Sequence, residues 1–491
     1  MVASQIAIEA FNINYQKELK PASAAKYGEL AEQTIIFRYL SSSCLQKQSI
    51  LMKTFLAPLL HKTGKIKLVI THFPITFYLF IGFSLFGFQT SSAQSPNTIL
   101  PGAYQTQNYF KWIQHKNVAL FANHTATIGN THLVDTLLKA GIHIVKAFGP
   151  EHGFRGKADD GKVIADDIDP VTGIPIISLY GAKRKPTPDD LKDVDMIIID
   201  IQDVGTRFYT FISSVQEILE AAFENNKSVI LLDRPNPNGF YVDGPVLDTA
   251  YKSFVGMQPI PTVYGLTIGE YANMLIGEHW LSKEADRHFY ENYAQHSFSK
   301  HLPSFLIVRC KNYDHNSRYQ LPIPPSPNLP DMASVYWYAG NCLFEGTVLS
   351  EGRGTPHPFC YIGHPDLPNN MFLFTPVPGP GATNPKLNGK NCYGWNLYAP
   401  ENEVLATIHN QLPVQYLIKA YALFPDKAHF FIIPKQGNEK MNAFNRLAGS
   451  DQLMKQIQAG LTEKEIRAGW QPQLSAFKKI RKKYLLYKDF N

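Results

Sequence analysis

Short apolar runs alternate with segments of helical periodicity over residues 117–232. The runs predict strands at 117–123, 142–148, 174–179, 195–201 and 228–232. The run at 195–201 is apolar at almost every position, which is typical of a strand covered on both faces of a parallel sheet. Segments 133–140 and 211–225 have helical spacing. Since strands and helices alternate through short links, we predict an α/β fold with a doubly wound parallel sheet.

The turns after these strands contain no GxGxxG, no P-loop lysine and no GxSxG elbow. The sequence therefore predicts a Rossmann-like architecture without a nucleotide and without a serine nucleophile. From about residue 259 the chain becomes rich in proline and aromatic residues. We expect a Rossmann-like catalytic domain at 94–258 and a smaller α+β C-terminal domain at 259–491 that completes a cleft.

Residues 1–93 predict a leader that precedes the folded domains. A basic flank at Lys62, Lys65 and Lys67 is followed by an apolar run at 68–88 and by Ser-Ser-Ala-Gln at 91–94. This is the order of a secretory signal peptide, so we expect cleavage near Ala93 and a periplasmic or secreted protein. Met52 would begin a leader of conventional length, with 1–51 as a mis-annotated extension. An uncleaved anchor is the alternative, but His72 and Pro74 inside the run favour cleavage and no stable membrane anchor afterwards.

Composition places the remaining chain among folded globular proteins. Hydrophobic residues make up 44% and aromatic residues 12% of the sequence, which is ample for a buried core. Roughly 400 residues after the leader favour two domains over one. The net charge of +6 is spread out, and the basic stretch at 478–483 is typical of a solvated helix face, so nucleic acid is not indicated as a partner.

Four cysteines follow the predicted leader, namely Cys310, Cys342, Cys360 and Cys392. None has the close spacing of a zinc knuckle. An oxidising compartment would allow one or two disulfides, and buried unpaired thiols are the alternative that the sequence leaves open.

Three acid-rich turns follow predicted strands. They read GPEHGFRG at 149–156, DIQDVGTRFYT at 200–210 and LDRPNPNG at 232–239. Strands that end in charged and Gly/Pro residues place those side chains on one rim of a parallel sheet, where open α/β folds assemble their sites. The sequence therefore predicts an enzyme with a pocket of carboxylates and arginines.

Six motifs in order give the chain a family resemblance. Besides the three turns, they include TGIPIISLYG at 172–181, PPSPN at 324–328 and EGTVLSEGRGTPHPF at 345–359. The set resembles the NamZ-type exo-β-N-acetylmuramidases, glycoside hydrolases of bacterial peptidoglycan recycling. The resemblance implies release of a terminal non-reducing β-1,4-linked N-acetylmuramic acid from muropeptides or MurNAc-GlcNAc oligosaccharides. It also implies a site between a Rossmann-like and a smaller domain, and no cofactor.

Glu151 is the first candidate for the general acid of such a reaction. Glycosidic cleavage needs an acid that protonates the departing oxygen. Glu151 directly follows a predicted strand, and Pro150, Gly153 and Phe154 would keep its carboxyl partly dry. An N-cap or an ion pair with Arg155 is the structural alternative.

The second carboxylate remains open between Asp200, Asp203, Glu345 and Glu351. We retain Asp203 and Glu351 as catalytic candidates, and Asp200 as a substrate contact. Glu351 lies in a Gly-rich loop whose backbone could approach a ligand closely. A 2-acetamido sugar can also supply its own nucleophile, in which case the second acid only steadies the acetamido group.

Four arginines inside the motifs are candidates for gripping the lactyl carboxylate of muramic acid. They are Arg155, Arg207, Arg234 and Arg353. A planar guanidinium fits a carboxylate in a bidentate way. We expect at least two of the four to be structural, holding acids of their own motifs.

Neutral and aromatic side chains complete the predicted substrate contacts. His152 would bind a hydroxyl or orient Glu151, and Tyr209 would form a wall for the pyranose ring. Asn236, Ser326 and Asn328 offer hydrogen bonds from Pro-flanked turns, where capping of the turn is the alternative role.

Two other classes of protein stay open at this point. A metal-dependent hydrolase would use Glu151, His152, Asp200 and Asp203 as ligands, although the chain contains no HExxH motif. A non-catalytic cell-wall binding protein would recognise the same sugar without cleaving it.

Overall fold

A computed structural model describes residues 98–491, except 152, 156–164, 297–303, 437 and 491. The segment Pro96–Asn491 forms one compact unit. The predicted leader at 1–93 lies outside the described residues, and so does His152. No helix in the described part is long and apolar enough to cross a bilayer.

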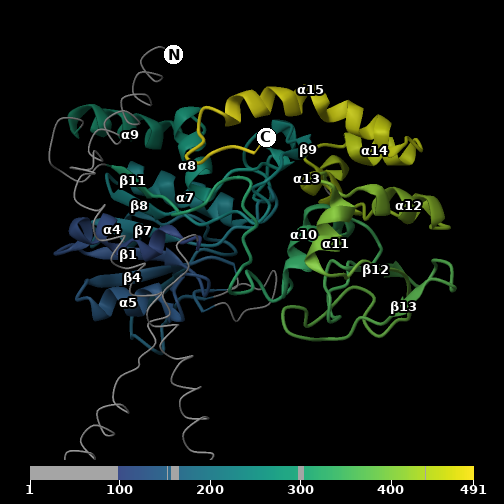
Figure 1. Cartoon of the computed structure of the whole chain (residues 1–491), viewed down its shortest axis with the longest axis horizontal. Helices are drawn as coiled ribbons and strands as arrows, with labels where there is room; N and C mark the ends of the chain where they lie inside the picture. The colour runs from purple at the N-terminus through teal and green to yellow at the C-terminus, as the bar shows by residue number, and fades with distance from the viewer. Residues whose placement is uncertain (1–97, 152, 156–164, 297–303, 437, 491) are drawn as a thin grey trace, which may run out of the picture. The chain divides into compact units, whose positions relative to one another are not determined.

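A seven-stranded sheet organises the first half of this unit (Figure 1). Its order is β11-β8-β7-β1-β4-β6-β5, and every pairing is parallel except that of β5 with β6. The strands are β1 (Val118–Ala122), β4 (Ile144–Gly149), β5 (Asp167–Ile168), β6 (Pro175–Ser178), β7 (Met196–Asp200), β8 (Ser228–Leu232) and β11 (Phe305–Val308). In chain order, the parallel strands have the 3-2-1-4-5-6 arrangement of a Rossmann fold. All five predicted strands are present, and the predicted fold class is confirmed.

The middle of the sheet is covered on both faces. All five residues of β1 and all five of β7 are buried. Val118, Leu120 and Ala122 face one core with α4 (Thr106–Ile113) and α5 (Leu133–Lys139). On the other face, α7 (Phe211–Glu224) contacts β7 and β8. Helices thus lie on both faces, as the apolar run at 195–201 predicts.

Two further helices extend the layer formed by α7. They are α8 (Ile268–Gly277) and α9 (Lys283–His296), and both contact α7. The edge strand β11 lies beyond residue 258, the domain boundary expected from composition. The sheet therefore draws one strand from the segment 259–491.

The second half is built on a small antiparallel sheet and several helices. The sheet has the order β12-β14-β13, with β12 (Tyr361–His364), β13 (Phe372–Phe374) and β14 (Cys392–Asn396). The helices are α10 (Met332–Asn341), α11 (Glu401–Ile408), α12 (Gln415–Leu423), α13 (Ala443–Ala448), α14 (Gln452–Gln458) and α15 (Glu463–Arg481). A 3-10 helix, η3 (Cys342–Gly346), directly follows α10.

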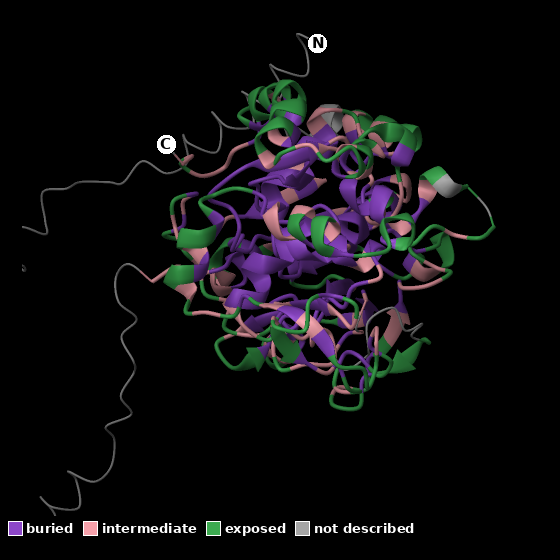
Figure 2. Cartoon of the chain, turned by 90° about the vertical axis from the view of Figure 1, so that its right-hand side faces the viewer, coloured by how far each residue is buried: buried purple, intermediate pink, exposed green. Residues whose placement is uncertain are grey.

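The C-terminal segment returns to the large sheet. Helix α15 contacts β9 (Asp243–Val246), which pairs with β10 (Pro261–Val263). Beyond α15, the hydroxyl of Tyr487 donates to Oδ2 of Asp233 at 2.6 Å, just after β8. Figure 2 shows the buried residues gathered in the interior, with exposed residues on the outer helices and loops. The two halves are therefore tied together by buried contacts.

Short elements fill the connections. They are η1 (Gly102–Tyr104), β2 (Thr127–Ile128), β3 (Thr131–His132), α6 (Pro188–Leu191), η2 (Thr249–Tyr251), η4 (Lys427–His429) and η5 (Glu439–Met441). The four cysteines Cys310, Cys342, Cys360 and Cys392 are all buried and unpaired. Of the two possibilities that the sequence left open, the structure has free thiols.

Candidate active site

A cavity of about 190 Å³ lies at the carboxyl rim of the large sheet. It joins residues of both halves of the chain, and its lining residues are Glu151, Tyr180, Phe208, Tyr209, Thr210, Val255, Ser326, Asn328, Leu329, Tyr338, Cys342, Glu345, Arg353, Phe359 and Leu447. Among the described residues, Glu151 and Glu345 are the two acids in this lining. Five of the six sequence motifs therefore meet here.

Glu151 enters the cavity from the turn after β4. Glu151 is half-buried, and the hydroxyl of Thr210 donates a hydrogen bond to Oε2 of Glu151 at 3.0 Å. Thr210 is the N-cap of α7, yet its side chain makes no capping hydrogen bond. A threonine at this position usually caps the helix, so here the hydroxyl holds the acid instead.

Aromatic rings form one wall of the cavity. The ring of Tyr338 on α10 meets those of Phe208, Tyr209 and Phe359 edge to face, with centroids 5.3, 6.0 and 4.8 Å away. Phe359 has a φ of 62°, a left-handed conformation that is rare for a bulky residue. Such outliers concentrate at functional sites. The predicted pyranose wall at Tyr209 is thus part of a larger aromatic surface.

The PPSPN loop is fixed to the rim of the sheet. The hydroxyl of Tyr209 donates to the carbonyl oxygen of Pro325 at 2.9 Å, and Nε2 of His124 lies 2.8 Å from that of Pro324. The loop brings Ser326 and Asn328 to the cavity. Nδ2 of Asn328 donates to the carbonyl oxygen of Gly381 at 2.8 Å.

Arg353 reaches the cavity from a loop that needs its two glycines. Gly352 and Gly354 have φ values of 81° and 76°. A Cβ at these positions would lie 2.6 Å from the carbonyl oxygen of Tyr361 and 2.5 Å from that of Val377. Other residues would be strained there, so the motif SEGRGT specifies the loop that presents Arg353.

A chain of opposite charges runs away from the cavity through Arg353. Its Nη1 lies 2.7 Å from Oε1 of Glu345 and 3.2 Å from Oε1 of Glu351, and Nζ of Lys386 lies 2.8 Å from Oε2 of Glu351. Burial alone would raise the pKa of Glu351, but Lys386 and Arg353 outweigh burial and lower it to about 2. Glu351 is therefore ionised throughout the physiological range.

A second cavity of about 360 Å³ adjoins the first. Glu345 and Arg353 line both, and Glu351 and residues 381–386 complete the second. Glu351, a predicted catalytic acid, thus lines the adjoining cavity and forms ion pairs with Arg353 and Lys386.

Asp200 and Arg234 form a buried ion pair. Nε and Nη2 of Arg234 donate to the two carboxylate oxygens at 2.5 and 2.9 Å, and the Asp200 side chain is completely buried. Neither residue is in the described lining of the cavity. These two predicted substrate contacts therefore bind each other in the structure.

Asp203 is buried away from the cavity. The backbone N–H of Gly205 donates to its Oδ2 at 2.6 Å, and the hydroxyl of Tyr264 donates to the same oxygen. Burial raises the pKa of Asp203 to about 7, although both hydrogen bonds favour the charged form. The structure does not bring this predicted catalytic acid to Glu151.

Arg155 and Arg207 also have structural partners. Arg155 donates to both carboxylate oxygens of Asp169 at 2.8 and 2.6 Å. Arg207 is fully buried and donates to the carbonyl oxygens of Pro245, Ile260 and Leu447 at 2.8 to 2.9 Å. Of the four candidate arginines, Arg353 is the one in the described lining of the cavity.

Asn236 stabilises its own turn. Its Nδ2 donates to the carbonyl oxygen of Leu266 at 2.8 Å, and its Oδ1 accepts the backbone N–H of Asn238 at 2.8 Å. This is the capping role named as the alternative for such residues. His152 lies outside the described residues.

Two of the predicted metal ligands have other partners in the structure. Asp200 is bound by Arg234 and Asp203 by Tyr264, and the described residues contain no group of three or more His, Cys, Asp or Glu side chains that could hold a metal ion. Nothing in the described region therefore favours the metal-dependent alternative.

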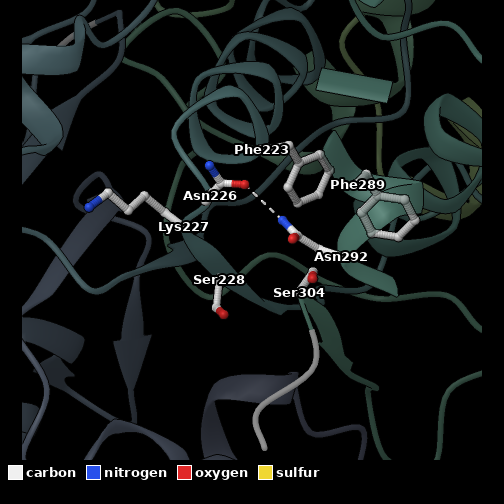
Figure 3. A pocket seen from close by; sticks show the side chains of 7 residues that line it. All are labelled: Phe223, Asn226, Lys227, Ser228, Phe289, Asn292 and Ser304. Atoms are coloured by element: carbon white, nitrogen blue, oxygen red, sulfur yellow. Dashed lines mark hydrogen bonds between the residues drawn. The ribbon is translucent and has the colours of Figure 1, made fainter. Parts of the chain in front are cut away.

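Another cavity lies at the opposite rim of the sheet. It measures about 210 Å³ and lies beside Ser228 and Ser304, which precede or begin β8 and β11 (Figure 3). Nδ2 of Asn292 donates to Oδ1 of Asn226 at 2.9 Å across it. Its described lining has no carboxylate, and in open α/β folds the ligand binds at the carboxyl ends of the strands.

Several lining residues escaped the sequence argument, among them Thr210, Tyr180 and Tyr338. Tyr180 lies two residues after β6 in TGIPIISLYG, and Thr210 ends the motif DIQDVGTRFYT, so their place in these motifs was an available signal. Tyr338 lies on α10 amid other aromatic residues and carries no sequence signal of its own.

Comparison with known proteins identifies the same family as the sequence motifs do. The family described as "Exo-beta-N-acetylmuramidase NamZ, N-terminal" matches residues 118–333, and its C-terminal counterpart matches 336–487. The chain is 34% identical over 455 residues to "Peptidoglycan beta-N-acetylmuramidase NamZ" of Bacillus subtilis (strain 168), covering 84% of this chain and 99% of that protein.

Two solved structures from Bacteroides fragilis NCTC 9343 are also similar. Both are DUF1343 family proteins, with 42% identity and a TM-score of 0.68 for one, and 28% and 0.63 for the other. Each covers 80% of this chain, and 99% and 100% of its own. With matches that span both halves and the cavity between them, the chain belongs to the exo-β-N-acetylmuramidase NamZ family.

Proposed function

We propose that the protein is an exo-acting glycoside hydrolase that releases terminal non-reducing β-1,4-linked N-acetylmuramic acid from peptidoglycan fragments. The observation that carries the proposal is the cavity in which Glu151 lies among aromatic rings, a second carboxylate and an arginine. Family membership over residues 118–333 and 336–487 supports it, and a relative that is 34% identical is named a peptidoglycan β-N-acetylmuramidase.

Glu151 is the general acid in this proposal. It gives its proton to the oxygen that leaves with the N-acetylglucosamine residue. The aromatic wall excludes water from one side of the ring, and the hydroxyl of Thr210 fixes the orientation of the carboxyl. Both features favour a proton transfer with fixed geometry.

The test is the release of free N-acetylmuramic acid from a MurNAc-GlcNAc disaccharide or a chromogenic β-muramide. We expect turnover by the purified protein, and a loss of about 10² to 10⁴ in rate for Glu151→Gln. Glu291→Gln is the matched control, because Glu291 lies exposed on α9 in an ion pair with Arg287. Binding of the sugar without release by the native protein would contradict a hydrolase.

We also propose that the mature protein begins near Gln94 and acts in the periplasm or outside the cell. The basic flank, the apolar run at 68–88 and the Ser-Ser-Ala-Gln sequence support this. Mass spectrometry of the native N-terminus tests the proposal, and peptides from residues 1–51 would contradict it.

A further inference from the structure

We infer that Glu345 is the second catalytic carboxylate, acting at the anomeric carbon on the face of the sugar opposite the leaving oxygen. This inference rests on the proposed function and deepens it. Glu345 comes from η3 in the second half of the chain, whereas Glu151 comes from the turn after β4. The two acids reach one cavity from different parts of the fold.

The exposure of the side chains distinguishes Glu345 from the other three candidates for the second carboxylate. Asp200 is completely buried against Arg234, and Asp203 is buried with the hydroxyl of Tyr264. Glu351 lines the adjoining cavity, and its side chain is only 4% exposed. The Glu345 side chain is 30% exposed and lines the cavity that holds Glu151. A carboxylate must reach the sugar to act on it, so exposure to this cavity decides between the four.

Neighbouring groups hold the Glu345 carboxylate in place. Nη1 of Arg353 lies 2.7 Å from its Oε1, and a cation at that distance stabilises a carboxylate. The thiol of Cys342 donates to the same oxygen at 3.6 Å. Burial raises the pKa of that thiol well above its usual value, so it remains a protonated donor. Since η3 also packs against α13, the carboxylate has a rigid support.

Arg353, Glu351 and Lys386 act as positioning residues for Glu345. Glu351 is held ionised by Lys386 and pairs with the guanidinium that contacts Glu345. Lys386 also donates to the carbonyl oxygens of Phe344, Thr347 and Leu349, on either side of Glu345. The chain of charges thus fixes the backbone and the guanidinium on which Glu345 depends.

The reaction balances with these two carboxylates. The bond between C1 and the glycosidic oxygen breaks, and Glu151 gives its proton to that oxygen. A water molecule supplies the new hydroxyl on C1 and returns one proton to a carboxylate. The negative charge of Glu345 stabilises the positive charge that develops at C1 in the transition state.

The test compares Glu345→Ala and Glu345→Gln with the native protein on a chromogenic β-muramide. We expect both variants to lose about 10²-fold or more in kcat. Adding sodium azide should restore turnover in Glu345→Ala, because azide fits the space of the missing carboxylate and attacks C1 from that side. The product should be the α-muramyl azide, identified by NMR. The rescue also shows that the variant is folded.

Each outcome decides the inference. A Glu345→Ala variant within tenfold of the native rate overturns it, as does rescue that gives a β-azide, which indicates nucleophilic assistance by the acetamido group. No rescue in a variant with native melting behaviour also overturns it. The proposed function fails separately if the native protein and the Glu291→Gln control both release no sugar.

Discussion

The hydroxyl of Thr210 lies 3.0 Å from Oε2 of Glu151 and joins the first residue before α7 to the acid that follows β4. Removing one partner of a buried hydrogen bond costs about 1 to 3 kcal/mol. We expect Thr210→Val to lower kcat by roughly 10- to 100-fold with little change in KM, because the carboxyl loses its orientation while the sugar keeps its other contacts.

Thr210→Ser is the control for this prediction. It keeps the hydroxyl and removes only a methyl group, so steady-state kinetics should return values close to native. If Val and Ser variants lose activity equally, packing of the methyl group matters and the hydrogen bond does not.

Arg353 offers a test of sugar selectivity. It is the candidate arginine in the cavity lining, and a guanidinium there can contact the lactyl carboxylate of muramic acid. We expect Arg353→Met to lower the ratio of kcat/KM for a β-muramide over a β-N-acetylglucosaminide by about 10-fold or more, in proportion to a lost charged hydrogen bond.

The ratio of the two kcat/KM values distinguishes recognition of the lactyl group by Arg353 from positioning of Glu345 by Arg353. Loss of support for Glu345 slows both substrates alike, whereas loss of lactyl recognition slows only the muramide. An unchanged ratio would assign Arg353 to Glu345 alone.

The sequence predicted the sheet because its strands carry strong local signals. The runs that became β1 and β7 are buried along their whole length, and all their residues except Asp200 are apolar. It also predicted that Glu151 lies after a strand. It could not tell which arginine lines the cavity, since Arg234 and Asp200 pair across 34 positions and Arg207 reaches Leu447 across 240. Such partners depend on tertiary packing.

Asp200 and Arg234 provide a prediction about stability. Removal of one partner leaves a buried charge uncompensated and typically costs about 3 to 5 kcal/mol. We expect Asp200→Asn to lower the free energy of unfolding by about that amount in urea denaturation, while KM at low temperature stays near native.

A double variant is the matched control for the ion pair. Asp200→Leu with Arg234→Met removes both charges, so it should cost less than either single change. A stable Asp200→Asn protein with a raised KM would instead assign Asp200 to the substrate.

Asp203 should make the protein less stable as the pH rises from 3.8 to about 7. Burial raises its pKa to about 7 in the folded state, against an ordinary value of 3.8. Between these values the folded protein holds a proton that the unfolded chain releases, so the stability from the buried neutral carboxyl is present below pH 3.8 and is lost as the pH rises to 7. The difference between these two pKa values corresponds to on the order of 4 kcal/mol in the free energy of unfolding.

The Asp203→Asn variant tests this prediction. Its amide cannot ionise, and the amide oxygen can still accept hydrogen bonds from Gly205 and Tyr264. Urea denaturation between pH 4 and 8 should therefore show the variant gaining stability over the native protein as the pH rises. Parallel curves for the two proteins would mean that Asp203 is already ionised when buried, and that the cluster around Tyr264 stabilises its charge.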